Sequence, residues 1–132
     1  MADLVSKIKE LYAAFGRGDV ATLLGHMTDD VSWEFEAPAA ISWGGNRRGP
    51  TEAAGFFAGI AAEHADPVLN ITEFFESGDA VAAFGRYDAT IRATGVHVST
   101  PVAHYFKFRD GKVCRFMNFI NTAAFVEAAT QA

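Results

Sequence analysis

The chain has 132 residues, which is the length of one domain, and half of them are apolar while 20% are charged, a balance typical of folded globular proteins rather than disordered ones. The formal net charge is −5, and Arg47 and Arg48 are the only adjacent basic residues, so the sequence lacks the clustered basic face of a nucleic-acid-binding protein. Because Cys114 is the single cysteine, no internal disulfide can form.

Two stretches of the sequence bear on the cellular location of the protein. The opening residues, MADLVSKIKE, lack the basic and then apolar pattern of a secretory signal. The longest nearly apolar run, GFFAGIAA, is far too short to cross a bilayer. We therefore expect one cytoplasmic domain that covers residues 1–132, with no membrane segment and no nucleic-acid partner.

The first part of the chain predicts two helices. Apolar residues recur there at helical spacing, at Leu4, Ile8, Leu11, Tyr12 and Phe15. Gly16 or Gly18 can end this helix. Asp19 is then a suitable N-cap for a second, shorter helix with an apolar side formed by Leu23, Leu24 and Met27.

A strand and a third helix follow. In VSWEF, residues 31–35, Trp33 and Phe35 alternate with polar residues, as in a strand with one buried face. Residues 36–50 are rich in glycine and proline and predict a loop. The next helix begins near Pro50 and contains Gly59. Glycine inside a helix costs about 1 kcal/mol relative to alanine, so we attribute Gly59 to the close approach of another backbone.

From Val68 onward the pattern is that of strands. Four segments are separated by turns at residues 77–79, 94–95 and 110–111, which predicts four antiparallel strands joined as a meander. Asn121 or Thr122 then caps a final short helix around Phe125. Helices followed by a run of strands place the chain in the α+β class.

The last predicted hairpin carries two polar residues, His104 and Asn118, in apolar surroundings. A two-residue turn at 110–111 would set Phe106 against Arg115, whose side chains belong to different faces. We therefore predict a three-residue turn with a glycine-type bulge. Phe106 then opposes Phe116, and His104 opposes Asn118 on the inner face of the sheet.

This pair allows two interpretations. His104 can be a general base, since an ordinary histidine pKa of about 6.5 suits proton transfer near neutrality, or it can be a core histidine bonded to Asn118 or to a backbone carbonyl. Asn118 cannot exchange protons. It can hold or polarise a ligand carbonyl as a hydrogen-bond donor, or it can be a structural amide paired with His104.

Other candidate residues also have structural explanations. Trp33 and Trp43 can stack on a planar ligand, and Tyr87 can reach the same pocket, while the alternative for Trp33 is a position in the core. Cys114 falls on the predicted inner face, where a thiol is inert. The carboxylates at positions 34 and 36 fall on the opposite, exposed face. The four histidines lack the spacing of metal ligands, so we expect neither a metal nor a cofactor.

The chain resembles the SnoaL-like, ketosteroid isomerase-like branch of the nuclear transport factor 2-like superfamily in three stretches: YAAFGRGDVATLLGHMTDDVSWEF, ISWGGNRRGPTEAAGFF and HYFKFRDGKVCRFMNFINTAAF. The resemblance implies a cone-shaped α+β roll, in which a strongly curved antiparallel sheet wraps around three N-terminal helices and an internal pocket, followed by a short C-terminal helix. It also implies a homodimer through the outer sheet face, with Tyr105, Met117 and Phe119 in the interface.

The resemblance further implies which residues surround the pocket. In this branch the pocket walls come from the first strand, the third helix and the inner face of the sheet. In this chain Trp43 is placed to close the mouth of the pocket, and Tyr87 can reach into the pocket. The residues at the wall positions are Trp33, Phe35, Phe56, Phe57, Ile60, His104, Phe106, Phe116 and Asn118.

The catalytic positions of the family are only partly kept. In ketosteroid isomerases a carboxylate base, an oxyanion tyrosine and a second acid align with Phe35, Leu11 and His104 of this chain, which argues against that reaction. An acid of the polyketide cyclases aligns with Asn118. We therefore expect a pocket for a small, mainly apolar, carbonyl-bearing or aromatic molecule. Any reaction there would be a proton transfer such as isomerisation, cyclisation or dehydration, and the alternative is a non-catalytic binding or accessory dimer module.

Overall fold

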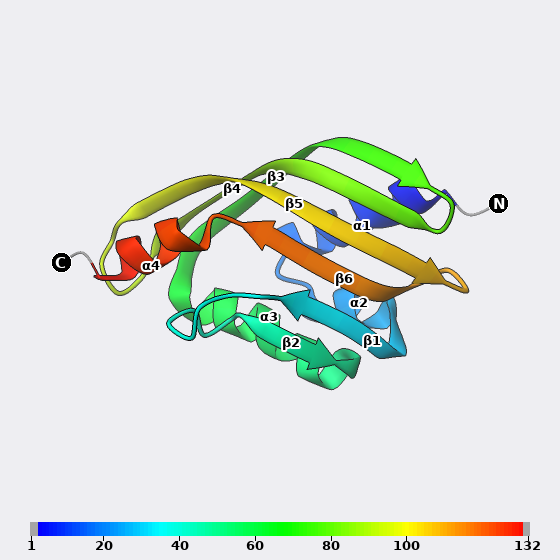
Figure 1. The fold of residues 1–132 in the computed structure, drawn as a ribbon, viewed down its shortest axis with the longest axis horizontal. Helices are drawn as coiled ribbons and strands as arrows, with labels where there is room; N and C mark the ends of the chain where they lie inside the picture. The colour runs from blue at the N-terminus through cyan, green and yellow to red at the C-terminus, as the bar shows by residue number, and fades with distance from the viewer. Residues whose placement is uncertain (1–2, 131–132) are drawn as a thin grey trace.

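The computed structural model describes residues 3–130 and shows an α+β fold built on one curved sheet of six strands (Figure 1). The strands follow the order β2-β1-β6-β5-β4-β3 across the sheet. Their bounds are β1 Met27–Phe35, β2 Gly45–Arg48, β3 His64–Ser77, β4 Ala80–Ile91, β5 His97–Arg109 and β6 Lys112–Ile120. The predicted fold class and the meander of the last four strands are confirmed.

Three helices lie on one face of this sheet, and a fourth lies beyond the end of β6 (Figure 1). They are α1 Leu4–Gly16, α2 Val20–Gly25, α3 Gly49–Glu63 and α4 Thr122–Thr130. The core fills the space between the helices and the concave face of the sheet. Within residues 3–130, none of the helices is both long enough and apolar enough to cross a membrane.

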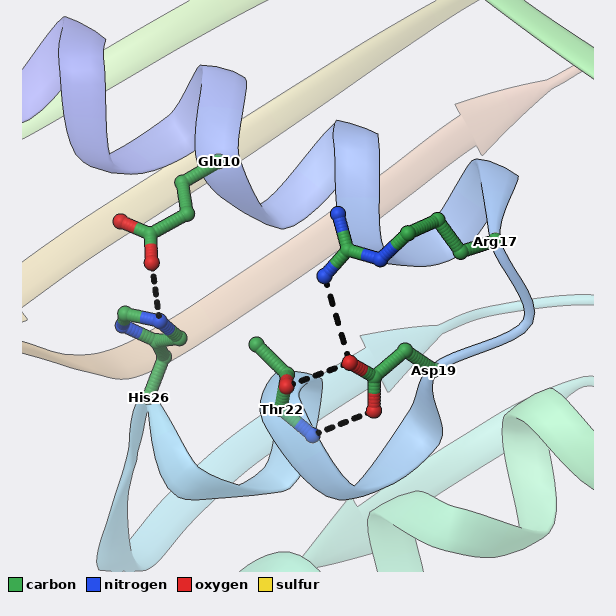
Figure 2. Close-up of polar contacts among 5 residues, drawn as sticks. All are labelled: Glu10, Arg17, Asp19, Thr22 and His26. Atoms are coloured by element: carbon green, nitrogen blue, oxygen red, sulfur yellow. Dashed lines mark hydrogen bonds and ion pairs between the residues drawn. The ribbon is translucent and has the colours of Figure 1, made fainter.

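Polar contacts fix α1 and α2 against each other (Figure 2). Asp19 caps α2 as predicted, because its carboxylate accepts a hydrogen bond from the backbone N–H of Thr22 at 3.2 Å. Arg17, at the end of α1, pairs with the same carboxylate at 3.2 Å. Glu10 of α1 reaches His26, which follows α2, at 3.5 Å. These contacts set the position of α1, whose other side faces the core.

The β5–β6 hairpin has the predicted pairing but not the predicted turn. His104 opposes Asn118 and Phe106 opposes Phe116, which confirms the pairing. The prediction of a three-residue turn is wrong. Asp110 and Gly111 alone form the turn, both with positive φ, because such a turn follows the right-handed twist of the strands.

The extra residue that the pairing needs lies in β6 itself. Lys107 opposes Arg115 and Phe108 opposes Val113, so Cys114 is the unpaired residue of a β-bulge. The bulge turns the buried Val113 inward and leaves Cys114 half-buried beside a groove on the outer side. The prediction that Cys114 lies on the inner face is therefore wrong.

Two further features differ from the sequence-based expectations. Residues 45–48, expected in a loop, form β2, an edge strand that pairs antiparallel with β1. β1 in turn pairs with β6, and this one pair is parallel, with Trp33 opposite Phe116. The sheet is thus antiparallel except at the β1–β6 junction. This junction places the tryptophan of the first strand directly beside the last hairpin.

The third helix begins and packs as expected. Pro50 lies in its first turn. A Cβ atom on Gly59 would lie 2.7 Å from the Cβ of Trp43 and 3.1 Å from its Cα, closer than carbon atoms can approach. Gly59 therefore lets the loop before β2 lie directly on α3, and the close approach inferred from the sequence is confirmed.

Candidate functional site

A cavity of about 60 Å³ lies between the helices and the concave face of the sheet. Its walls are almost entirely apolar, and side chains from all the helices and strands except β2 and α4 contribute to them. Among the residues that line it are Trp33, Trp43, Phe56, Phe57, Ile60, Tyr87, His104, Phe106, Phe116 and Asn118. The structure thus brings together nearly all the side chains that the sequence pointed to, and their role in binding stays a prediction.

Phe35 is the exception. It is buried, but it packs against Trp43 and Phe56, with ring centroids 4.8 and 6.2 Å away, and it is not part of the cavity wall. The loop after β1 folds back so that Trp43 takes the wall position at this end of the strand. Trp43 is itself buried, so it closes the cavity as part of the packed core.

Aromatic rings form much of the wall. Trp33 stacks on Phe116, with ring centroids 3.9 Å apart and planes inclined by 17°, because the parallel β1–β6 pairing places them opposite each other. Phe56 and Phe57 of α3 meet the indole ring edge-on or tilted, at 5.8 and 5.5 Å. Such a wall suits a planar or aromatic ligand.

The polar centre of the cavity is a hydrogen bond between a half-buried tyrosine and a buried histidine. The hydroxyl of Tyr12, on α1, lies 2.8 Å from Nδ1 of His104, on β5, and the two rings stack. Asn118 faces His104 across the β5–β6 pair. His104 is 8% and Asn118 7% exposed, so water reaches neither freely.

Burial keeps this centre uncharged. It lowers the pKa of His104 to about 4, while the adjacent Asn118 side chain acts in the opposite direction. Burial also raises the pKa of Tyr12 far above its ordinary value. At neutral pH, His104 is therefore a neutral imidazole and Tyr12 a neutral phenol. A histidine with so low a pKa is a weak general base.

Tyr12 was not predicted as a site residue. The sequence shows it only as one apolar-spaced position of the first helix, and the family resemblance aligned the neighbouring Leu11 with the oxyanion tyrosine of ketosteroid isomerases. In the structure both residues line the cavity. The available signal was that Tyr12 is the one residue of that apolar stripe with a hydroxyl at its tip, which needs a partner when buried.

Two polar atoms of the cavity-lining residues have no hydrogen-bond partner. They are Nε1 of Trp33 and Oδ1 of Asn118. Within residues 3–130, the only other buried side-chain nitrogen or oxygen without a hydrogen-bond partner is Oγ1 of Thr28. Asn118 lies near enough to raise the pKa of His104, yet no hydrogen bond to Oδ1 is formed. Leaving such a group unpaired costs about 1–3 kcal/mol.

A second histidine–tyrosine pair lies beside the cavity. The hydroxyl of Tyr87 is 2.7 Å from Nδ1 of His64, which packs between the rings of Trp43 and Phe125. Burial, helped by the positive charge of Arg92, lowers the pKa of His64 to about 4. The Tyr87 hydroxyl therefore already has a hydrogen-bond partner outside the cavity wall.

The remaining candidates lie outside the cavity. Glu34 is on the outer face as predicted and pairs with Arg115 at 2.8 Å. Arg47 donates hydrogen bonds to the carbonyl oxygens of Trp43 and Gly44, at 3.1 and 3.0 Å, and so secures the loop. No three histidine, cysteine or acidic side chains in the described part of the chain gather closely enough to hold a metal ion.

Comparison with models of protein families identifies the family of the chain. The family model described as a SnoaL-like domain matches residues 8–116, which is most of the chain. The chain belongs to the SnoaL-like domain family. A search of curated proteins found no match to this SnoaL-like protein.

Solved structures show the same fold over the full length. An NTF2-like protein of unknown function from Burkholderia pseudomallei is 26% identical, with a TM-score of 0.88, covering 98% of this chain and 99% of that one. An NTF2-like protein from Burkholderia thailandensis is 26% identical, with a TM-score of 0.87 and coverages of 97% and 98%. TerC, co-crystallised with polyporic acid, is 28% identical, with a TM-score of 0.85 and coverages of 95% and 96%.

Proposed function

We propose that this SnoaL-like protein binds a small, uncharged, mainly apolar compound with an aromatic or carbonyl group. The observation that carries the proposal is an aromatic cavity with one polar cluster, formed by Tyr12, His104 and Asn118. Apolar walls with a few convergent polar groups are the usual form of a small-molecule site. The co-crystal of TerC with the small molecule polyporic acid supports the proposal.

The charge state of the cavity argues for a neutral ligand. No Asp, Glu, Lys or Arg side chain is part of the wall, and His104 is neutral at neutral pH. An ion would lose its hydration there without gaining a partner, which is strongly unfavourable. A ligand with a ring of any size must also displace side chains, because the cavity of about 60 Å³ has room for only a few water molecules.

Catalysis is the second candidate, favoured by the hydrogen bond between Tyr12 and His104. The Tyr12 hydroxyl oxygen can accept a hydrogen bond from Nδ1–H, and Nε2 is then unprotonated and free to accept a proton. His104 would take a proton from one atom of a bound carbonyl compound at Nε2 and return it to another atom of the same compound, with Asn118 holding the oxygen. Turnover of a retained ligand that persists in His104→Gln would exclude this role for His104, and absence of turnover in the wild-type protein would leave binding as the function.

Thermal shift in the presence of neutral aromatic compounds tests the binding function. We expect compounds that enter the cavity to raise the melting temperature of the wild-type protein. Ile60→Trp fills the cavity and should abolish the shift, whereas Val68→Trp adds the same ring at an exposed position and should preserve it. Binding that is equal in both variants would contradict the assignment. Native mass spectrometry of gently purified protein would identify any ligand that it retains.

We further propose that the outer face of the sheet forms a homodimer. Phe84, Ala103 and Phe119 are neighbours across β4, β5 and β6, and Tyr105 pairs with Met117 in the next row. Phe84 is 41% and Phe119 52% exposed, which is unusual for phenylalanine on a free surface. An apolar patch of this kind on the outer face of a sheet suits association with a second copy of itself.

A further inference from the structure

We propose that the ligand carries a neutral hydroxyl group, as in a phenol or an enol, and that this hydroxyl accepts a hydrogen bond from Trp33 and donates one to Asn118. The inference rests on the proposed function, because it specifies the chemistry of a compound bound in the same cavity. It also makes Trp33 and Asn118 the residues that determine specificity.

The two unpaired atoms are of opposite kinds. The indole Nε1–H of Trp33 can only donate a hydrogen bond, and Oδ1 of Asn118 can only accept one. Both belong to residues of the same narrow cavity wall, yet they do not bond to each other. A single group that satisfies both must accept a hydrogen bond from Trp33 and donate one to Asn118.

The fold places the two residues on adjacent strands. Trp33 is paired with Phe116 across the parallel β1–β6 junction. Asn118 lies two residues farther along β6, so its side chain points to the same face of the sheet as that of Phe116. The donor and the acceptor thus come from adjacent strands, and they are fixed by the sheet rather than by a mobile loop.

A hydroxyl is the smallest group that meets this requirement. A ketone or an ether would pair with Trp33 and leave Oδ1 of Asn118 unsatisfied. A phenolate or enolate could not donate, and its charge would have no counterion among the wall residues. Next to the stacked rings of Trp33 and Phe116, an aromatic or conjugated hydroxyl compound fits both the polar and the apolar parts of the wall.

Titrations of ¹⁵N-labelled protein with phenol, toluene and anisole test the inference. Toluene replaces the hydroxyl with a methyl group of similar size, and anisole can accept but not donate. The indole N–H resonance of Trp33, assigned from its absence in Trp33→Phe, should move on binding of phenol but much less with toluene. The ratio of phenol to toluene affinity should fall roughly two- to tenfold in Trp33→Phe and also in Asn118→Leu.

The ratio of phenol to toluene affinity is compared between each variant and the wild-type protein. This comparison cancels the different free-energy costs of removing the two probes from water. It also cancels any general loosening of the cavity that a substitution causes. A ratio unchanged in both variants, or anisole binding as tightly as phenol, would overturn the hydroxyl inference while the binding function stands. Failure of all three probes to bind the wild-type protein would overturn the cavity as a binding site, and the hydroxyl inference with it.

Discussion

His104 and His64 are each buried in the core with a tyrosine hydroxyl on Nδ1. In both cases burial disfavours the imidazolium, so the folded protein holds two neutral histidines whose pKa values are about 4. The consequence at the scale of single residues is a pH dependence of stability. Between pH 7.5 and pH 5 it arises mainly from the histidines, because paired carboxylates such as Glu34 have lowered pKa values and stay ionised in this range.

The sign of this dependence follows from the depressed pKa values. Between pH 6.5 and pH 4, the unfolded chain binds protons at these two positions that the folded protein does not bind, so stability is full above pH 6.5 and falls as the pH drops. We expect each histidine to remove about 2 kcal/mol of unfolding free energy between pH 7.5 and pH 5. Urea denaturation at the two pH values measures the loss.

Glutamine at either position should reduce that loss, while His97→Gln, at an exposed site on β5, serves as the matched control. Equal pH dependence in His104→Gln, His64→Gln and the control would show that the buried histidines do not cause it. Glutamine keeps the hydrogen-bonding capacity of the side chain. The unfolding free energy of each variant is compared between the two pH values, so the general effect of the substitution on stability cancels.

At the scale of elements, the contact between α3 and the Trp43 loop holds one side of the cavity. Gly59 permits this contact because any larger residue would overlap with Trp43. The loop itself is secured by Arg47, which bonds its backbone carbonyls. The packing of one glycine against one tryptophan therefore fixes the position of a whole wall segment.

Gly59→Ala tests the importance of this contact. We expect a loss of about 1–3 kcal/mol of unfolding free energy, because the added methyl group must push Trp43 away from the helix. Gly16→Ala at the end of α1 is the control, since a Cβ there meets no atom within 4 Å and the alanine should be neutral or slightly stabilising. Chemical denaturation gives both values, and near-ultraviolet circular dichroism reports on Trp43. A neutral Gly59→Ala would show that the loop adapts freely.

At the scale of the whole molecule, the sheet separates two surfaces for which we propose different roles. The concave face holds the cavity, and the convex face carries the exposed aromatic rows of β4, β5 and β6. Side chains alternate between these faces along each strand. A substitution on the outer face can therefore change association without reaching the cavity.

Phe119→Glu should convert the proposed dimer into a monomer, because it places a charge in the apolar row beside Ala103. Val68→Glu, on β3 and equally exposed in the monomer, should leave the dimer intact. Sedimentation equilibrium of both variants and the wild type measures the association. A monomeric wild-type protein would refute the dimer outright.

The sequence predicted the parts of this architecture that depend on local pattern. The alternation of apolar and polar residues predicted the strands, and Asp19 predicted the start of the second helix. The matching faces of the last two strands predicted the pairing of His104 with Asn118. It did not predict the parallel β1–β6 pair, since Trp33 and Phe116 are far apart in the chain and no local pattern reports their contact. Tyr12 was missed for the same reason, because its partner is on a distant strand.

The bulge in β6 has a practical consequence for experiments on the protein. It turns the single thiol of the chain, Cys114, away from the cavity that the neighbouring Val113 lines, and leaves it half-buried near Glu34 and Arg115. A spin label or fluorophore attached there would sit on the outside of the sheet at one defined site per chain. Pairs of such labels would report the spacing of two copies, while the binding site stays free for titration.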